Sequence, residues 1–238
     1  MDIKTQMQNL RLYGMHRSWQ ELIETKKHHE LTLSEGLELL LQAEEEDKKN
    51  RRFDRLRKNA RFRYQVSIEE LRFDASRGMN KELIMTLATG NYIRDGQSIL
   101  ITGATGCGKS YLASALGHQA CCQGYKVAYY SLQKLLQQTK MARLEGKMMK
   151  FFERLAKTDL LILDDFGLFY LEQQHRLDLM EILEDRHNKK STIIASQLPV
   201  ENWYEIIAEE TIADAILDRF VHTSYRFELK GESLRKKQ

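Results

Sequence analysis

One segment limits the fold more than any other: a short apolar run that leads into a glycine-rich loop and then into a helix. Residues 98–102 (SILIT) have the composition of a buried strand, and residues 103–110 follow as GATGCGKS. This loop matches G-x-x-x-x-G-K-[ST], and an apolar helical segment, 111–122, comes next. A strand, such a loop and a helix in this order predict a phosphate-binding loop in an α/β protein.

The chemistry of the loop indicates a nucleotide as its ligand. Glycine allows backbone conformations that point successive N–H groups at phosphate oxygens, and the following helix N-terminus adds partial positive charge. We expect Lys109 to reach the β- and γ-phosphates of ATP and the Ser110 hydroxyl to bind Mg²⁺. A chance match in a structural turn is the alternative, which the flanking strand and helix disfavour. The expected nucleotide-binding residues here are Gly103, Ala104, Thr105, Gly106, Cys107, Gly108, Lys109, Ser110 and Tyr111.

A second apolar strand ends in an acidic pair. Residues 159–163 (DLLIL) precede Asp164 and Asp165, which is the Walker B pattern. Asp164 is expected to hold Mg²⁺ through water, and Asp165 to orient or deprotonate the attacking water. The two carboxylates could instead cap the next helix. Further strands are predicted at 126–131, 192–195 and 225–229, so strands alternate with helices and indicate a parallel sheet flanked by helices.

Two more residues are candidates for sensing the γ-phosphate. Gln197 follows the strand 192–195, at the end where open parallel sheets bind ligands, and could position water. A glutamine that only satisfies loop carbonyls is the alternative. Arg219, in the segment 214–220 (DAILDRF), is either an ordinary surface partner of Asp218 or a finger that reaches the nucleotide of a neighbouring subunit.

The net charge of +3 hides a strongly basic stretch. A capping box at 32–35 (TLSE) and apolar residues at helical spacing predict a long helix from residue 33 to about residue 64. Its acidic residues Glu44, Glu45 and Asp47 precede basic residues at i+4. The basic run is either a solvated, salt-bridged face or a contact surface for duplex DNA phosphates. The candidate DNA contacts are Lys48, Lys49, Arg51, Arg52, Arg55, Arg57, Lys58, Arg61 and Arg63.

Composition sets the remaining limits. Three cysteines and one proline argue against a disulfide framework and for a helix-rich fold. We see no signal peptide and no apolar stretch long enough to span a membrane, so a cytoplasmic protein is expected. An amphipathic segment, 5–27, is expected to pack on the long helix. The predicted organisation is a helical DNA-binding and oligomerisation region, 1–70, followed by an ATPase core, 71–238.

With these residues in place, the chain resembles the IstB-like transposition helper ATPases, a branch of the AAA+ class related to the DnaC and DnaI helicase loaders. The resemblance rests on GATGCGKSYLA, LLILDDFGL, STIIASQLPVENW, TIADAILDRFVH and GESLRK. It implies a P-loop NTPase (AAA+) core without a separate lid domain. By resemblance, Gln197 falls on the sensor 1 position and Arg219 on the arginine-finger position. Arg235 matches a characteristic C-terminal arginine that would contact nucleotide, DNA or a neighbouring subunit.

The resemblance also implies a task. Such helpers oligomerise with ATP on duplex DNA, deform it and recruit the transposase of the same element, with Mg²⁺-dependent hydrolysis linked to turnover of the assembly. A helicase loader that acts on a replicative helicase and single strands shares the same core. A small-molecule kinase also uses a Walker A loop, although the acidic pair and the candidate finger speak against it. A non-hydrolysing DNA clamp stays open as well, because Asp165 stands where many relatives have Glu.

Overall fold

The computed structural model describes residues 2–221 and 224–234, except for the side chains of residues 219–221. Contacts divide the chain into two compact units, Met1–Arg55 and Leu56–Gln238. The division falls before the expected boundary at residue 70, so residues 56–70 pack with the second unit.

The first unit consists of short helices and the beginning of a long one. Helix α1 covers Ile3–Asn9, α2 covers Tyr13–Glu24 and α3 covers Leu33–Ala60. The amphipathic segment 5–27 is therefore divided between two helices. The chain breaks between α1 and α2, where Arg11 adopts a left-handed conformation with φ +58°. Such a residue cannot continue a right-handed helix, so α2 starts in a new direction.

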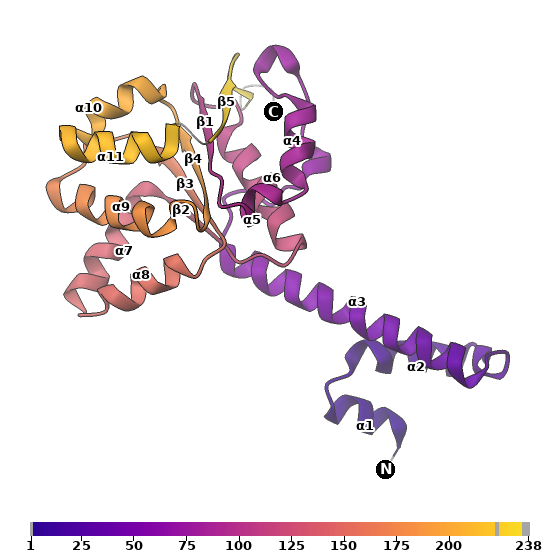
Figure 1. Ribbon diagram of the computed structural model, residues 1–238. Helices are drawn as coiled ribbons and strands as arrows, with labels where there is room; N and C mark the ends of the chain where they lie inside the picture. The colour runs from indigo at the N-terminus through magenta and orange to yellow at the C-terminus, as the bar shows by residue number, and fades with distance from the viewer. Residues whose placement is uncertain (1, 222–223, 235–238) are drawn as a thin grey trace. The chain divides into compact units, whose positions relative to one another are not determined.

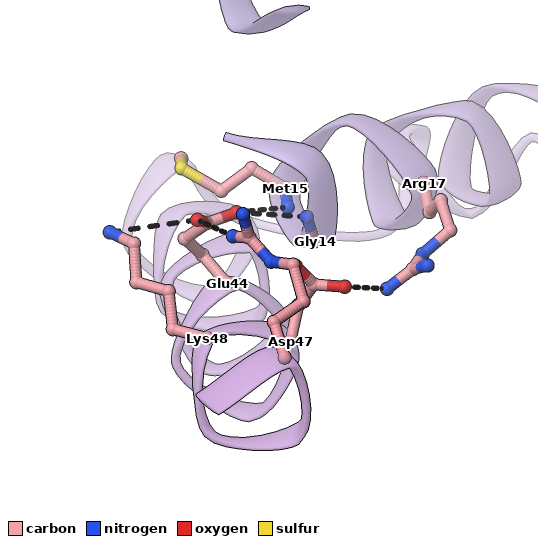
Figure 2. A network of polar contacts seen from close by, with 7 residues as sticks. Gly14, Met15, Arg17, Glu44, Asp47 and Lys48 are labelled. Atoms are coloured by element: carbon pink, nitrogen blue, oxygen red, sulfur yellow. Dashed lines mark hydrogen bonds and ion pairs between the residues drawn. The ribbon is translucent and has the colours of Figure 1, made fainter. Parts of the chain in front are cut away.

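Helix α2 packs on α3 through a glycine and a buried carboxylate. A Cβ atom on Gly14 would lie 2.2 Å from the carbonyl oxygen of Ala43, so only glycine permits this approach. The N–H groups of Gly14 and Met15 donate to the Glu44 carboxylate at 2.8 and 3.3 Å (Figure 2). Glu44 is 4% exposed and satisfies the free N–H groups at the start of α2. The expected packing on the long helix is confirmed for α2.

Helix α3 follows the sequence pattern at its start but ends early. In the capping box, Thr32 N–H donates to Glu35 at 2.8 Å and Glu35 N–H donates to Thr32 Oγ1 at 3.3 Å. The three i,i+4 ion pairs also form, Lys48–Glu44, Lys49–Glu45 and Arg51–Asp47. The helix stops at Ala60, before Arg61 with φ +58°. Arg61 and Arg63 therefore do not lie on the basic helix, contrary to the expectation.

The second unit is built on a five-stranded parallel sheet with the order β2-β3-β4-β1-β5. All five predicted strands are confirmed. The isoleucines and leucines of the three central strands, β1, β3 and β4, have almost no exposed surface, as expected when helices cover both faces of a parallel sheet. The strands are β1 (Ile99–Gly103), β2 (Val127–Ser131), β3 (Leu160–Phe166), β4 (Ser191–Ser196) and β5 (Tyr225–Leu229).

Helices lie on both faces of the sheet (Figure 1). One face carries α4 (Lys81–Ala88), α5 (Asn91–Arg94) and α6 (Lys109–Cys122). The other face carries α7 (Leu132–Leu144), α8 (Met148–Ala156), α9 (Gln173–Arg186), α10 (Trp203–Ile207) and α11 (Glu210–Val221). None of the described helices combines the length and the apolar composition that crossing a membrane requires.

One buried arginine joins β3 and β4 at their amino ends. Arg186, 1% exposed, donates from its guanidinium to the carbonyls of Leu155, Thr158 and Ser191 at 2.6, 2.8 and 2.5 Å. Burial lowers the pKa of this guanidinium to about 10. The amino end of the sheet is thus closed by a structural contact, and the candidate site lies at the opposite, carboxyl end.

Candidate nucleotide site

The sheet order brings the candidate segments to one edge. Strand β4 lies between β1 and β3. Because the strands are parallel, the loop after β1, the acidic pair on β3 and the residues after β4 all meet at the carboxyl edge. The Ser196 hydroxyl donates to the Phe166 carbonyl at 2.9 Å and joins the ends of β4 and β3. Open parallel sheets bind ligands at this edge.

The phosphate loop is shaped by glycines and closed by its own lysine. Gly103, Gly106 and Gly108 all have positive φ, at 144°, 81° and 109°. Helix α6 begins directly after them at Lys109. The Lys109 ammonium donates to the carbonyls of Gly103 and Ala104 at 2.7 and 2.8 Å and is largely buried. Positive charge and the N-terminus of a helix therefore meet inside the loop.

The acidic pair sits on an irregular part of β3. The register with β4 shifts between Leu163 and Phe166, and Asp165 has φ +58°. This conformation lets Asp165 N–H donate to Asp164 Oδ1 at 2.9 Å. Helix α9 is preceded by Glu172, so neither aspartate caps the next helix and that alternative is wrong. A strained backbone at such a position is typical of functional sites.

Asp164 is contacted by Tyr129 and Arg63, and the sequence alone suggested neither as its partner. The Tyr129 hydroxyl donates to Asp164 Oδ2 and is also hydrogen-bonded to the Ser110 side chain. Burial, together with the charge of Asp164, raises the pKa of Tyr129, which keeps the phenol protonated as a donor. Arg63 Nη1 lies 3.3 Å from Asp164 Oδ2 and 3.0 Å from Asp165 Oδ2. Arg63, expected on a DNA-binding helix, is instead ion-paired with the Walker B carboxylates.

Gln197 contacts the phosphate loop directly. The Thr105 hydroxyl donates to Gln197 Oε1 at 2.6 Å. The residue after β4 and the loop after β1 are therefore brought together, as expected from the parallel sheet. This partner of Gln197 could not be predicted from the loop motif, because Thr105 occupies a variable position of it.

The structure describes only part of the two C-terminal candidate residues, Arg219 and Arg235. Arg219 lies in α11, but its side chain is outside the described residues, and so is the whole of Arg235. The residues before Arg235 lie against the phosphate loop. Leu234 N–H donates to the Gly106 carbonyl at 2.9 Å, and Arg77 donates to the Glu232 carbonyl at 2.7 Å.

The remaining candidate DNA contacts lie on α3 or just after it. Three of them, Lys48, Lys49 and Arg51, are ion-paired with acidic residues of the same helix. These ion pairs neutralise part of the positive charge of the basic run. The side chains of Arg52, Arg55, Lys58 and Arg61 are exposed, and Arg57 is half-buried.

The residues at this edge fit a nucleoside triphosphate with Mg²⁺. Among the described residues, no three His, Cys, Asp or Glu side chains form a ready-made metal cluster. Ser110 and Asp164 provide oxygen ligands that share Tyr129 as a neighbour. Mg²⁺ prefers such oxygen ligands, few of them from protein, with phosphates and water completing the shell. Lys109 and the start of α6 supply the charge that phosphates need.

A parallel sheet of this order, with a phosphate loop after β1 and an acidic pair on β3, defines a P-loop fold of the AAA+ type. Among solved structures, AMPPCP-bound DnaA from Aquifex aeolicus has a TM-score of 0.61 and 20% identity, over 74% of this chain and 54% of that chain. The DnaC helicase loader has a TM-score of 0.54 and 23% identity, over 64% and 90%. At these identities the likeness shows the fold.

Sequence comparison narrows the class to a family. Residues 5–238 match the family described as IstB-like ATP binding protein, and the chain belongs to this family. The insertion sequence ATP-binding protein y4pL of Sinorhizobium fredii is 42% identical, over 95% of this chain and 93% of its own length. The insertion sequence IS1162 ATP-binding protein of Pseudomonas fluorescens is 43% identical, over 82% and 85%.

Proposed function

We propose that this protein is an ATP-dependent, DNA-binding helper of transposition. In this proposal it oligomerises with ATP on duplex DNA, remodels the DNA and recruits the transposase of the same element. Hydrolysis of ATP to ADP and phosphate, with Mg²⁺, is linked to turnover of the assembly. The observation that carries the proposal is the meeting of the phosphate loop, Asp164 and Gln197 at one sheet edge, in a chain whose relatives are ATP-binding proteins of insertion sequences.

Each site residue has a role in this scheme. Lys109 binds the β- and γ-phosphates, and Ser110 and Asp164 hold Mg²⁺. Asp165 and Gln197 orient the attacking water. The rest of the loop, from Gly103 to Tyr111, cradles the phosphates. Arg219 acts as an arginine finger toward a neighbouring subunit, and Arg235 contacts nucleotide, DNA or that neighbour.

Duplex DNA is proposed to contact the basic residues of α3. The support is the exposure of Arg52, Arg55 and Lys58 on one helix. Lysine and arginine side chains that neutralise phosphates release counterions, so affinity should fall steeply with salt. The chain shows no base-reading motif, and we expect recognition of the DNA backbone and shape.

The first test is electron microscopy and sedimentation of the protein with duplex DNA, with and without a slowly hydrolysed ATP analogue. We expect nucleotide-dependent oligomers on the duplex. Lys109→Ala should abolish them, because the phosphates lose their main cation. Asp165→Ala should assemble normally and persist with ATP. An Asp165→Ala protein that assembles and releases like the wild type would contradict hydrolysis-linked disassembly and favour a clamp that uses ATP only as a signal.

The DNA contact has its own test. The triple charge reversal Arg52→Glu, Arg55→Glu and Arg57→Glu should weaken duplex binding uniformly across sequences and flatten its salt dependence. Lys157→Glu, directly after α8, is a control for charge reversal elsewhere in the chain, because this exposed lysine pairs with Glu153 and is distant in sequence from the basic run. Unchanged binding by the triple variant would move the contact to the ATPase core. Preference for single strands, with copurification of a replicative helicase, would favour the loader function instead.

A further inference from the structure

Arg63 contacts both carboxylates of the acidic pair. Its guanidinium lies 3.3 Å from Asp164 Oδ2 and 3.0 Å from Asp165 Oδ2. Asp164 is 1% exposed, and a carboxylate buried this deeply is costly without a counter-charge. Arg63 supplies that charge.

The neighbours of Arg63 hold it in this place. Phe62, before it, is buried and packs on Gly117 of α6, and its ring meets the Tyr129 ring edge-on at 6.3 Å. Tyr64, after it, meets the ring of Tyr111 at 5.8 Å. Both flanking aromatic side chains thus rest on elements of the nucleotide site. The position of Arg63 is a consequence of packing on both sides.

The hydrogen bonds of Asp164 leave little room for a further cation. Asp164 Oδ1 accepts the N–H of Asp165, while Oδ2 accepts from both Tyr129 and Arg63. If Asp164 holds Mg²⁺, directly or through water, the metal would compete with Arg63 for this carboxylate. Two cations beside the same carboxylate repel each other. Metal binding and the Arg63 contact therefore oppose one another.

We propose that Arg63 is a built-in counter-cation of the Asp164–Asp165 pair, and that Mg²⁺ displaces it when the metal binds with nucleotide. The inference rests on the proposed role of Asp164 in holding Mg²⁺. Arg63 is then a positioning residue. It orients the two carboxylates and offsets their charge before the metal arrives. When Mg²⁺ displaces the guanidinium, the segment 61–66 loses this ion pair and is held more loosely, by the packing of Phe62 and Tyr64 alone.

The test is a Mg²⁺ titration of the binding of a fluorescent, non-hydrolysable ATP analogue to the full chain. Arg63→Gln removes the competing charge, so half-saturation should need about three- to tenfold less Mg²⁺ than in the wild type. Arg63→Lys restores the charge and should return the requirement toward the wild-type value. Arg94→Gln, which removes an exposed arginine paired with Asp95, should leave it unchanged.

The outcomes separate this inference from the proposed function. If Arg63→Gln needs as much Mg²⁺ as the wild type, or more, the counter-cation role is overturned while metal binding stands. If wild-type binding shows no Mg²⁺ dependence at all, the metal role of Asp164 fails and the inference fails with it. An equal effect of Arg63→Lys and Arg63→Gln would mean a merely structural role and would also overturn the inference.

Hydrogen–deuterium exchange of the wild-type protein gives a readout that needs no variant. The amides of residues 61–66 should exchange faster with the analogue plus Mg²⁺ than with the analogue plus a chelator. Equal or slower exchange with Mg²⁺ would show that the segment stays in place, and would overturn the displacement.

Discussion

The backbone N–H of Leu234 donates to the carbonyl oxygen of Gly106 at 2.9 Å, which ties the end of the described chain to the phosphate loop. Arg77 holds the same tail through the Glu232 carbonyl. The residues before Arg235 therefore lie against the phosphate loop, and we expect changes to this contact to affect nucleotide binding.

Gly106→Ala tests this contact. A Cβ atom at Gly106 would lie 2.1 Å from Ser233 Oγ and 3.1 Å from Ser233 Cα, so the tail or the loop must move. We expect nucleotide affinity to fall about tenfold or more. Gly146→Ala is the control, because Gly146 also has positive φ, at 66°, but opens onto free space. Gly146→Ala should lower the free energy of unfolding by about 1–2 kcal/mol and leave nucleotide affinity unchanged. Equal affinities of the two variants in a fluorescence titration would contradict the prediction.

Gly14→Ala tests the packing of α2 on α3. The new Cβ would lie 2.2 Å from the Ala43 carbonyl oxygen and 2.7 Å from Glu44 Cα, both backbone atoms that cannot rotate away. We expect the free energy of unfolding to fall by about 1–3 kcal/mol and the amides of α2 to exchange faster.

The matched control is Gly36→Ala, in the same unit and in open space within α3. It should stabilise the helix by up to about 1 kcal/mol, because alanine has the higher helix propensity. Urea unfolding followed by circular dichroism, together with hydrogen exchange, measures both. Similar effects of the two substitutions would argue against a close α2–α3 contact.

Arg186→Met tests the closed amino end of the sheet. The substitution keeps an unbranched side chain but removes the guanidinium donor of three buried carbonyls, of which the Leu155 carbonyl still accepts from Thr158 N–H at 3.1 Å. Because each unpaired buried group costs about 1–3 kcal/mol, we expect the free energy of unfolding to fall by at least about 2 kcal/mol in chemical unfolding. Arg176→Met on the same helix removes a single bond, to the Leu171 carbonyl, and should cost about 1 kcal/mol. A smaller loss of stability from Arg186→Met than from Arg176→Met would contradict the structural role of Arg186 at the amino end of the sheet.

Gln197 and Thr105 form a pair that a double-mutant cycle can test. Gln197→Ala should lower the rate of ATP hydrolysis about tenfold or more and change nucleotide affinity little, because its proposed partner is water. Thr105→Val removes the hydroxyl that orients Gln197 Oε1 and should lower the rate in the same direction. In the Gln197→Ala background, Thr105→Val should have little further effect. Additive losses in steady-state ATPase assays would show that the two residues act independently.

Several features of the fold and the site could be predicted from sequence because they depend on neighbours along the chain. The loop 103–110 needs only a strand before it and a helix after it, and the structure has both. The capping box at Thr32 and Glu35 is likewise confirmed. The break at Arg11 was missed, because the apolar spacing of the segment 5–27 continues across it while one left-handed residue ends the helix.

Arg63 shows where such local inference stops. Its place in a basic run favoured a position on the helix and a DNA phosphate as its partner, yet the helix ends at Ala60 and Arg63 pairs with carboxylates a hundred residues further along the chain. Tyr129 reaches Asp164 because β2 and β3 are adjacent in the sheet. Neither pairing leaves a periodic pattern in the sequence.

The sequence by itself determined the strand–loop–helix unit, the acidic strand end and the long charged helix, since hydrophobic periodicity, glycine freedom and capping act over a few residues. Only the tertiary structure decided which side chains meet at the site. Strand order sets which carboxyl ends are neighbours, and packing of Phe62 and Tyr64 sets where Arg63 lies. Those outcomes depend on the balance of burial and charge between segments that are distant in the chain, which no local pattern records.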